Sequence, residues 1–312
     1  MIGRTVLDNK TKFGYNRSMT SKELLRRFKN VRIWKSNGNR APHKPLLILL
    51  ALRYLINENQ EKISYATIEN ELSNLLKKYG TSSSSINPHQ PFWRLKNEKD
   101  SIWRVFNEES VTETASGDAK ITDLKKGDIH AGFKNDILDL LSNDNSNYKS
   151  LAKFILEEHF PDKIHNEILN DIGLELRFYN KDFKRKRDSK FRDKVLNSYN
   201  FKCSVCGFDL KFENRPLALE AAHIQWHTHG GPNIVSNGLA LCSQHHIFFD
   251  IGAISITHDY ELILSDRIHG SKGHLNRLFS ENKGEISLPT HFEDRPQKDF
   301  LDWHSREVFK KS

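Results

Sequence analysis

The fold of the C-terminal part of the chain is decided by residues 203–250, CSVCGFDLKFENRPLALEAAHIQWHTHGGPNIVSNGLALCSQHHIFFD. This stretch opens on Cys203-Ser-Val-Cys206 and closes near Cys242-Ser-Gln-His245, so two pairs of metal-binding residues share one spacing. A CxxC turn directs two sulfurs at one point, and the CxxH pair adds a third sulfur and an imidazole. Every cysteine of the chain is used in these pairs. The spacing predicts a structural zinc site of the Cys3His type rather than a disulfide framework.

A second group of polar residues lies between and just after the two pairs. His223 ends an apolar, strand-like run, Asn237 precedes another, and His246 and Asp250 share one face if their segment is helical. Hydrolysis of a phosphodiester needs a general base and a divalent ion. We expect His223 to be the base and the Asn237 carbonyl to hold its imidazole. His246 is then a ligand of the ion, with Asp250 either a second ligand or a local capping residue.

The order His223, Asn237, His246 inside a CxxC…CxxH frame resembles the HNH endonucleases. The resemblance covers roughly residues 190–265 and implies a ββα-metal fold of two strands and a helix. It implies that His223 is the catalytic base, that Asn237 positions it, and that His246 binds a catalytic Mg²⁺ or Mn²⁺. The pattern AAHI…NGLALC..HH..FD is similar to the McrA-like branch of the family, whose members act on modified DNA.

The chain departs from these relatives at one position. Many of them carry an acidic metal ligand directly before the base, where this chain has Ala222. Glu220, Asp250, or a histidine of the His227/His229 loop are the candidates for the missing ligand. We expect His227 and His229 to be exposed loop residues.

The N-terminal part contains one helix that should be buried. In the run APHKPLLILLAL, residues 41–52, Pro45 suits the first turn of a helix that is apolar nearly all round. His43 and Lys44 stand at its start, where free backbone N–H groups favour a phosphate. Further along, Phe92 to Leu95 and Ile102 to Phe106 are expected to pair as a β-hairpin.

Three segments of this part together resemble the sulfur-binding domain of phosphorothioate-dependent restriction enzymes. They are APHKPLLILLAL, PHQPFWRL and Ala115-Ser-Gly-Asp118. The resemblance implies that the sulfur of a modified phosphate lies against a small hydrophobic surface ringed by cations. The residues expected to contact the sulfur or the DNA are Arg40, His43, Lys44, Pro91, Phe92, Arg94, Ser116 and Gly117. The alternative for Phe92 and Trp93 is a place in the core, which is our expectation for Trp93. Relatives often have an aromatic residue where this chain has Gln90.

Length and charge fit a protein of two domains that meets a polyanion. The chain has 312 residues and a net charge of +8. Lys and Arg dominate residues 1–53 and 181–202, whereas Asp and Glu dominate residues 107–180. We expect a recognition domain over 20–165, a basic linker over 166–189 and an HNH domain over 190–312. An apolar run of about 18 residues and a signal-peptide core are both lacking, so we expect a cytoplasmic protein without a membrane partner.

The sequence therefore predicts an α+β endonuclease. Its N-terminal domain of mixed helices and strands recognises phosphorothioated double-stranded DNA, and its zinc-stapled ββα-metal domain hydrolyses nearby phosphodiester bonds by a one-metal HNH mechanism. One active site per chain favours a homodimer or sequential nicking. A first alternative is a McrA-like nuclease that reads methylated or hydroxymethylated cytosine in a pocket formed by Phe92, Trp93 and Trp103. A second is a zinc-stabilised DNA-binding protein without catalysis, although a zinc site alone would not need the His-Asn-His order.

Overall fold

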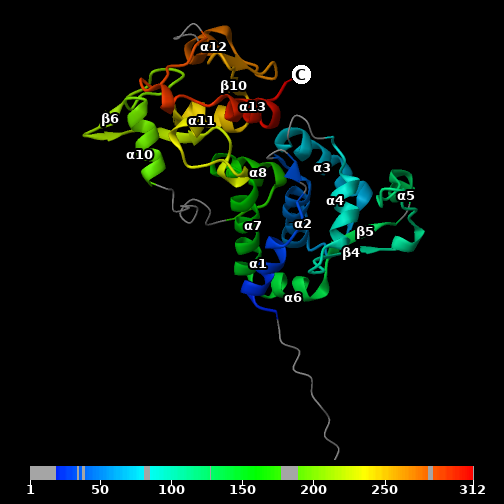
Figure 1. Cartoon of the computed structure of the whole chain (residues 1–312). Coiled ribbons are helices and arrows are strands. Elements are labelled where there is room, and N and C mark those ends of the chain that lie inside the picture. The colour runs from blue at the N-terminus through cyan, green and yellow to red at the C-terminus, as the bar shows by residue number, and fades with distance from the viewer. Residues whose placement is uncertain are drawn as a thin grey trace, which may run out of the picture.

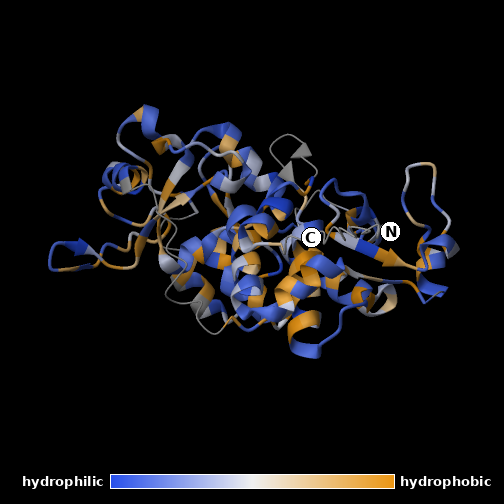
Figure 2. Cartoon of the chain, turned by 90° about the horizontal axis from the view of Figure 1, so that it is seen from below, coloured by the Kyte–Doolittle hydropathy of each residue, from blue (hydrophilic) through white to orange (hydrophobic). Residues whose placement is uncertain are grey.

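The chain folds around two separate hydrophobic cores. The computed structural model describes residues 19–33, 35–36, 39–80, 85–126, 128–176, 189–279 and 284–311. The buried residues of the first core run from Leu24 to Leu174, and those of the second from Phe191 to Leu301. Figure 1 shows the two units, with the blue-to-green N-terminal domain beneath the yellow-to-red C-terminal one. Figure 2 shows hydrophobic and hydrophilic segments alternating along the helices.

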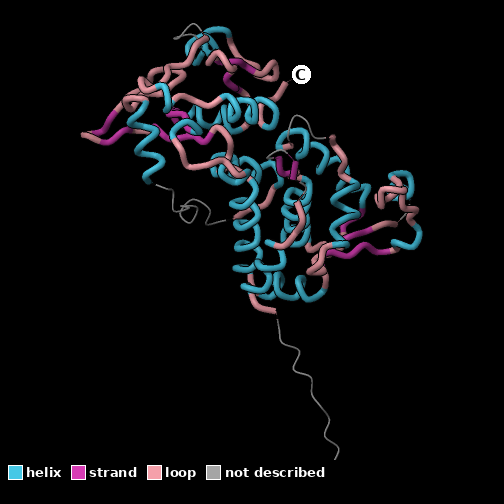
Figure 3. Tube along the Cα trace, in the orientation of Figure 1, coloured by secondary structure: helices cyan, strands magenta, loops and turns pink. Residues whose placement is uncertain are grey.

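The N-terminal domain is mostly helical with small sheets, as Figure 3 shows. The three-stranded sheet is antiparallel in the order β3-β5-β4. Its helices are α1 (Ser21–Lys29), α2 (His43–Glu58), α3 (Tyr65–Tyr79), α4 (His89–Arg94), α5 (Ile121–Lys126), α6 (Asn135–Asn143), α7 (Asn145–His159) and α8 (His165–Ile172). Its strands are β1 (Lys35–Ser36), β2 (Asn39–Arg40), β3 (Ile63–Ser64), β4 (Trp103–Phe106) and β5 (His130–Phe133).

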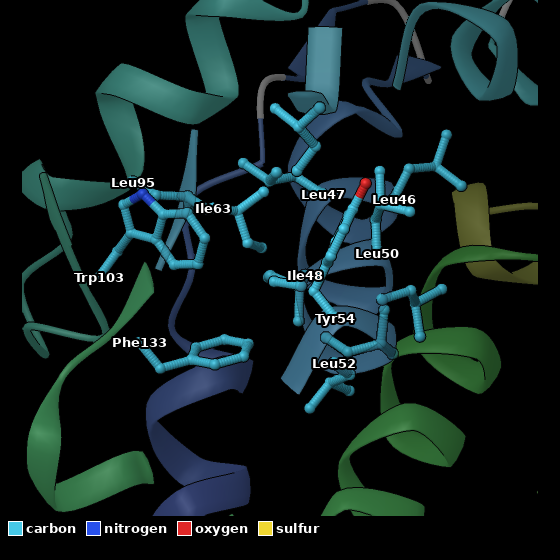
Figure 4. Close-up of a cluster of buried hydrophobic side chains, with 14 of the residues drawn as sticks. Leu46, Leu47, Ile48, Leu50, Leu52, Tyr54, Ile63, Leu95, Trp103 and Phe133 are labelled. Atoms are coloured by element: carbon cyan, nitrogen blue, oxygen red, sulfur yellow. The ribbon is translucent and has the colours of Figure 1, made fainter. Parts of the chain in front are cut away.

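Helix α2 is the buried centre of this domain, as its sequence predicts. Leu46 to Leu50 are fully buried, and α3, α4, α7 and α8 pack around the helix. Figure 4 shows α2 side chains such as Leu46 and Tyr54 on one side of the cluster and Trp103 and Phe133 on the other. An apolar helix of this kind is stable only when other elements cover every face.

The prediction of a hairpin between Phe92 and Phe106 is wrong for its first strand, Phe92 to Leu95. Residues 92–94 are the end of α4, which continues into a 3-10 turn, Leu95–Asn97. Strand β4 forms as expected but pairs with β5. Phe92 and Trp93 are both buried, because α4 packs against the core. The prediction failed because a short buried helix and a buried strand have the same kind of apolar run.

The first core extends beyond the expected end of the domain at residue 165. Ile168, Leu169 and Ile172 of α8 are buried in it, as is Leu174 after the helix. The second core begins at Phe191. Residues 177–188 of the expected basic linker lie outside the described residues.

The C-terminal domain contains the predicted ββα unit. Strands β8 (Leu219–His223) and β9 (Gly238–Cys242) are antiparallel, with His223 opposite Gly238, and α11 (Ser243–Asp250) follows β9 directly. The other elements are α10 (Ser189–Ser198), β6 (Lys211–Phe212), β7 (Arg215–Pro216), β10 (Ile254–Ile256), β11 (Leu262–Leu264), α12 (Lys272–Phe279) and α13 (Lys298–Glu307). Helix α10 packs across β8 and β9. This architecture confirms the predicted α+β fold.

The two domains contact each other beside the ββα unit. The 3-10 turn Asp162–Ile164, which follows α7, lies against α11. Lys163 pairs with Glu220 across the boundary, and the Lys310 ammonium donates to the carbonyl of Gly80 at the end of α3. Within the described parts of the chain, no helix is long and apolar enough to cross a membrane.

Candidate nuclease centre and DNA-binding surface

The four predicted zinc ligands come together. The ligand atoms of Cys203, Cys206, Cys242 and His245 all lie within 4.8 Å of one another. His245 Nδ1 is 3.1 Å from the Cys242 sulfur and 3.6 Å from the Cys203 sulfur. A zinc ion with bonds of about 2.0–2.3 Å to nitrogen and sulfur has ligand atoms roughly 3.5–3.8 Å apart. The cluster therefore fits a tetrahedral structural zinc.

Neighbouring backbone groups orient these ligands. The Nε2–H of His245 donates to the carbonyl of Leu278 at 3.0 Å, which leaves Nδ1 facing the sulfurs, as a histidine ligand requires. The CxxC turn closes through Gly207, whose N–H donates to the carbonyl of Cys203 at 2.9 Å. Gly207 has φ +70°, a conformation that side chains with a Cβ seldom adopt. The turn thus presents both sulfurs from a fixed backbone.

His223 stands at the end of β8, half-buried and held on two sides. Its ring stacks on Phe191, with centroids 4.0 Å apart and an angle of 14° between the planes. Its Nε2 lies 2.8 Å from the side-chain oxygen of Asn233. Sequence reasoning missed both neighbours, because Phe191 is an ordinary apolar helix residue and Asn233 follows a Gly-Gly-Pro turn without any special pattern.

The side chain of Asn237 is bonded to the loop that follows His223. It is fully buried, and its side-chain oxygen accepts from the N–H of Gln225 at 2.9 Å. Its amide group donates to the carbonyls of Gln225 and Pro232, both at 3.0 Å. A Cβ on Gly231 would lie 1.8 Å from the Gln225 oxygen, so the glycine is needed for this packing.

Asn237→Ala is expected to destabilise the C-terminal domain by about 1–3 kcal/mol, because it removes the fully buried side chain that bonds to the N–H and the carbonyl of Gln225. Denaturant unfolding measures this change in the free energy of unfolding. The matched control is Asn233→Ala, since Asn233 is exposed and should leave stability unchanged while cleavage falls. An equal loss of stability in the two variants would contradict the separate roles of the two asparagines.

His246 has a carboxylate beside each of its ring nitrogens. Its Nδ1 is 2.9 Å from Glu220 Oε2, and its Nε2 is 3.3 Å from Asp250 Oδ2. Burial raises the pKa of Asp250 to about 6. Burial alone would also raise the pKa of Glu220, but hydrogen bonds from His246 and Lys163 outweigh it and hold that pKa well below its usual range.

This geometry separates the roles of the two carboxylates. When the Nδ1–H of His246 donates to Glu220, Nε2 presents its lone pair beside Asp250 Oδ2. These two groups lie 3.3 Å apart, a spacing that can accommodate a cation held by both. Mg²⁺ binds at about 2.0–2.1 Å in octahedral geometry, which places adjacent ligands roughly 3 Å apart, and it is often held by one or two carboxylates with water and phosphate. His246 and Asp250 fit such an ion, with Glu220 orienting the imidazole.

These residues line a cleft of about 220 Å³ between the two domains. The C-terminal domain contributes His223, His246, Asp250 and Arg192, and the N-terminal domain contributes residues 160–163. Ala222, where many relatives carry an acid, is fully buried on the opposite face of β8, whereas Ala221 borders the cleft.

The two loop histidines differ from each other. His227 is exposed, as expected. His229 is only 8 % exposed and packs against Trp226 and Trp303, so the expectation of an exposed residue is wrong there. The apolar neighbours come from the loop itself and from α13, which the local sequence does not reveal.

The structure brings together several of the predicted DNA-binding residues. Arg94 of α4 makes a two-pronged pair with Asp118, and Gln90 Nε2 donates to the same carboxylate at 3.3 Å. Ser116 Oγ also lies 3.4 Å from Asp118, and Gly117 has φ +76° at the tip of the loop. Asp118 therefore holds the loop of residues 115–118 against α4. The PHQPFWRL and Ala115-Ser-Gly-Asp118 segments of the sequence thus form one surface.

The start of α2 lies near this surface. His43 Nε2 is 3.1 Å from the carbonyl of Ser85, just before α4, and its buried Nδ1 has no partner within the described residues. Burial lowers the pKa of His43. Among the described residues no side chain caps the helix at Pro42, so its first N–H groups keep their capacity to bind an anion.

Other predicted contacts lie elsewhere. Phe92 is fully buried edge-on against Tyr65 and Pro91 is also buried, so Phe92 takes the alternative place in the core. The Lys44 ammonium pairs with the buried carboxylate of Glu98. The side chain of Arg40 lies outside the described residues.

Models of known protein families match both the N-terminal and the C-terminal domain of the chain. The family model of the ScoMcrA-like DNA sulfur-binding domain matches residues 21–177, and the HNH endonuclease model matches residues 203–257. No curated protein matches the chain.

Similar solved structures cover half of the chain or less. The sulfur binding domain of ScoMcrA complexed with phosphorothioated DNA is 26% identical, with a TM-score of 0.43 over 48% of this chain and 94% of that chain. The Type IV phosphorothioation-dependent restriction endonuclease ScoMcrA is 26% identical, with a TM-score of 0.41 over 48% and 27%. The modification dependent TagI restriction endonuclease is 26% identical, with a TM-score of 0.28 over 39% and 38%.

Proposed function

This chain belongs to the ScoMcrA-like DNA sulfur-binding domain family and carries an HNH endonuclease domain, and we propose from this premise that it cuts DNA beside phosphorothioate linkages. The proposal rests on one observation. Residues of a domain of that family and the group of His223, His246 and Asp250 line the same cleft. The enzyme is then a modification-dependent restriction endonuclease.

His223 serves as the general base in this proposal. Its ring is stacked on Phe191 and lies beside the Asn233 side chain, so it loses little rotational freedom when it takes a proton from water. Asn237 fixes the loop that carries Asn233 through its bonds to the backbone. Arg192 borders the same cleft and provides positive charge for a phosphate.

His246 and Asp250 would hold a Mg²⁺ or Mn²⁺ ion, with Glu220 fixing the orientation of His246. The ion would supply charge neutralisation at the phosphate and the leaving oxygen. Asp250, at the C-terminal end of α11, thus replaces the acid that Ala222 cannot provide. Glu220 acts as the carboxylate behind a ligating imidazole, an arrangement common in metal sites.

The DNA is proposed to bind at the surface formed by the start of α2 and the 115–118 loop over α4. The uncapped N–H groups of α2 and the Arg94 side chain favour a phosphate there. Sulfur is more weakly hydrated than oxygen, so its burial at a partly apolar surface costs less desolvation free energy. The family to which residues 21–177 belong is a DNA sulfur-binding domain, which supports this assignment.

The alternative of a pocket for a flipped methylated cytosine finds little support. Phe92, Trp93 and Trp103, its proposed walls, are each at most 1 % exposed. A non-catalytic DNA-binding protein does not explain the nuclease cleft. Since each chain has one nuclease centre, we propose that double-strand cleavage uses two copies or two successive nicks.

A pair of identical duplexes, one with a phosphorothioate linkage and one without, tests the function. With Mg²⁺ or Mn²⁺ we expect the modified duplex to be cut faster by on the order of 10- to 200-fold, the discrimination that one good pocket provides. Gel measurement of initial rates gives this ratio. A methylated duplex without sulfur is the control. Equal rates on all three duplexes would reject sulfur recognition while keeping the nuclease.

A further inference from the structure

Lys163 is one of the residues that the sulfur-binding domain contributes to the nuclease cleft. Lys163 follows α7 in the turn Asp162–Ile164 and falls within the family match to that domain. Its ammonium lies 2.6 Å from Glu220 Oε1, on the other domain, and the residue lines the cleft together with His223 and His246.

We propose that Lys163 is a positioning residue of the nuclease centre, supplied by the DNA-recognition domain. It acts through a chain of contacts: Lys163 holds Glu220, and Glu220 holds Nδ1 of His246. The inference rests on the proposed function, because it assigns a role within that same centre.

The contacts of Glu220 explain why Lys163 is needed. One oxygen, Oε1, accepts from Lys163 and from Ser243 Oγ, at 2.6 and 3.0 Å. The other, Oε2, lies 2.9 Å from His246 Nδ1. Fixing Oε1 therefore sets the direction of Oε2, and Oε2 sets the plane of the imidazole. Without Lys163, Oε1 would keep only the neutral hydrogen bond from Ser243. A charge-assisted hydrogen bond is roughly twice as strong as a neutral one.

The pair is shielded, unlike an ordinary surface ion pair. The side chains of Lys163 and Glu220 are 21% and 16% exposed. Exposed pairs contribute little because water and salt screen them, whereas losing one partner of a shielded pair leaves the other charge poorly compensated. Without Lys163, Glu220 would be drawn to other cations in the cleft, including an ion bound by His246 and Asp250.

The placement couples recognition to cleavage. Lys163 lies in the turn that joins α7 to α8; this turn packs on α11, and both helices belong to the first hydrophobic core. The nuclease centre has its full set of contacts only when the sulfur-binding domain is seated on α11. Separation of the domains would therefore loosen His246 without any change in the nuclease sequence.

The test compares Lys163→Met and Lys163→Arg in the full chain, with Lys125→Met as the matched control. Lys125 belongs to the same domain and also forms an ion pair, with Glu69, but lies on α5, far from the cleft (Figure 1). Three quantities are measured on a phosphorothioated duplex: its Kd without a divalent ion, the maximal cleavage rate, and the Mn²⁺ concentration that gives half of that rate.

For Lys163→Met we expect the Kd to stay within about twofold, with a roughly 10- to 100-fold loss in maximal rate or in apparent Mn²⁺ affinity, as for other residues behind a metal ligand. Lys163→Arg should recover most of this loss, and Lys125→Met should match the unaltered chain. Unchanged rate and Mn²⁺ dependence in Lys163→Met would overturn the inference, and so would faster cleavage, which would make the contact inhibitory. If the unaltered chain itself cuts no duplex, the proposed function fails instead.

Discussion

His223→Ala should lower the rate of DNA cleavage by about 10²- to 10⁴-fold, the range attributed to a positioned general base. The side chain ends β8 inside the cleft and is held by Phe191 and Asn233. Alanine removes the proposed proton acceptor while keeping the strand, because β8 pairs with β9 through backbone bonds. The rate is measured at saturating phosphorothioated duplex, so that binding does not limit it.

The result is informative only if the fold and DNA binding persist. The Kd for the modified duplex should be unchanged, since the proposed binding surface lies on the other domain. His291→Ala serves as the control, because His291 is exposed and does not line the cleft. Retention of more than about a tenth of the activity in His223→Ala would show that another group or a metal-bound water activates the nucleophile.

The zinc frame and the grouping of His223 with His246 could be predicted from sequence because their geometry follows from local spacing. A CxxC pair forms one turn, and a CxxH pair spans the end of a strand and the first turn of a helix, so both spacings fix the direction of the ligands. His246 then falls one residue further along α11, on the face toward β8. Ligand directions that are set by local spacing do not depend on the packing of distant residues.

The partners of these residues could not be predicted, because they depend on tertiary packing. Asn233 and Phe191 reach His223 from a loop and from a helix that precedes the zinc site. The sequence leaves Glu220 as one of several candidates for the missing acid, and only the distances assign it to His246 Nδ1. Lys163 is 57 residues away from Glu220 in the chain and belongs to the other domain.

The error at Phe92 has a similar cause. The run from Phe92 to Leu95 is apolar except for Arg94, which fits a buried strand or a short helix equally well by composition. The neighbouring core decides, because α2 and Tyr65 leave space for the rings of Phe92 and Trp93 only beneath α4. The outer side of α4, where Arg94 meets Asp118, is then part of the surface that we propose for DNA.

Cys242→Ala is expected to have the largest effect on stability. Structural zinc contributes about 10–16 kcal/mol of binding free energy in small zinc domains, which exceeds the stability of most domains. Cys242 joins β9 to α11, so the site ties the second strand of the ββα unit to the CxxC turn. Without this sulfur the C-terminal domain should lose its zinc and its cooperative unfolding transition.

The N-terminal domain should survive the same change, because its core shares no buried residue with the second one among the described residues. The variant should therefore still bind the phosphorothioated duplex while it cuts none. Zinc content by atomic absorption, and limited proteolysis with fragment mapping, would follow the two domains separately. Loss of both domains at once would mean that the contact across the cleft contributes more than the zinc.

Ser204→Ala is the matched control for this experiment. Ser204 lies between the two cysteines of the CxxC turn and is fully buried, yet its hydroxyl has no partner within the described residues. Removing that hydroxyl loses no hydrogen bond, so zinc content and stability should be kept or slightly increased. Cys242→Ala could instead keep its zinc and its unfolding transition, as we expect for Ser204→Ala. Zinc ligation by Cys242 would then be dispensable, and the hydrophobic contacts of β8, β9 and α10 would hold the nuclease centre in place.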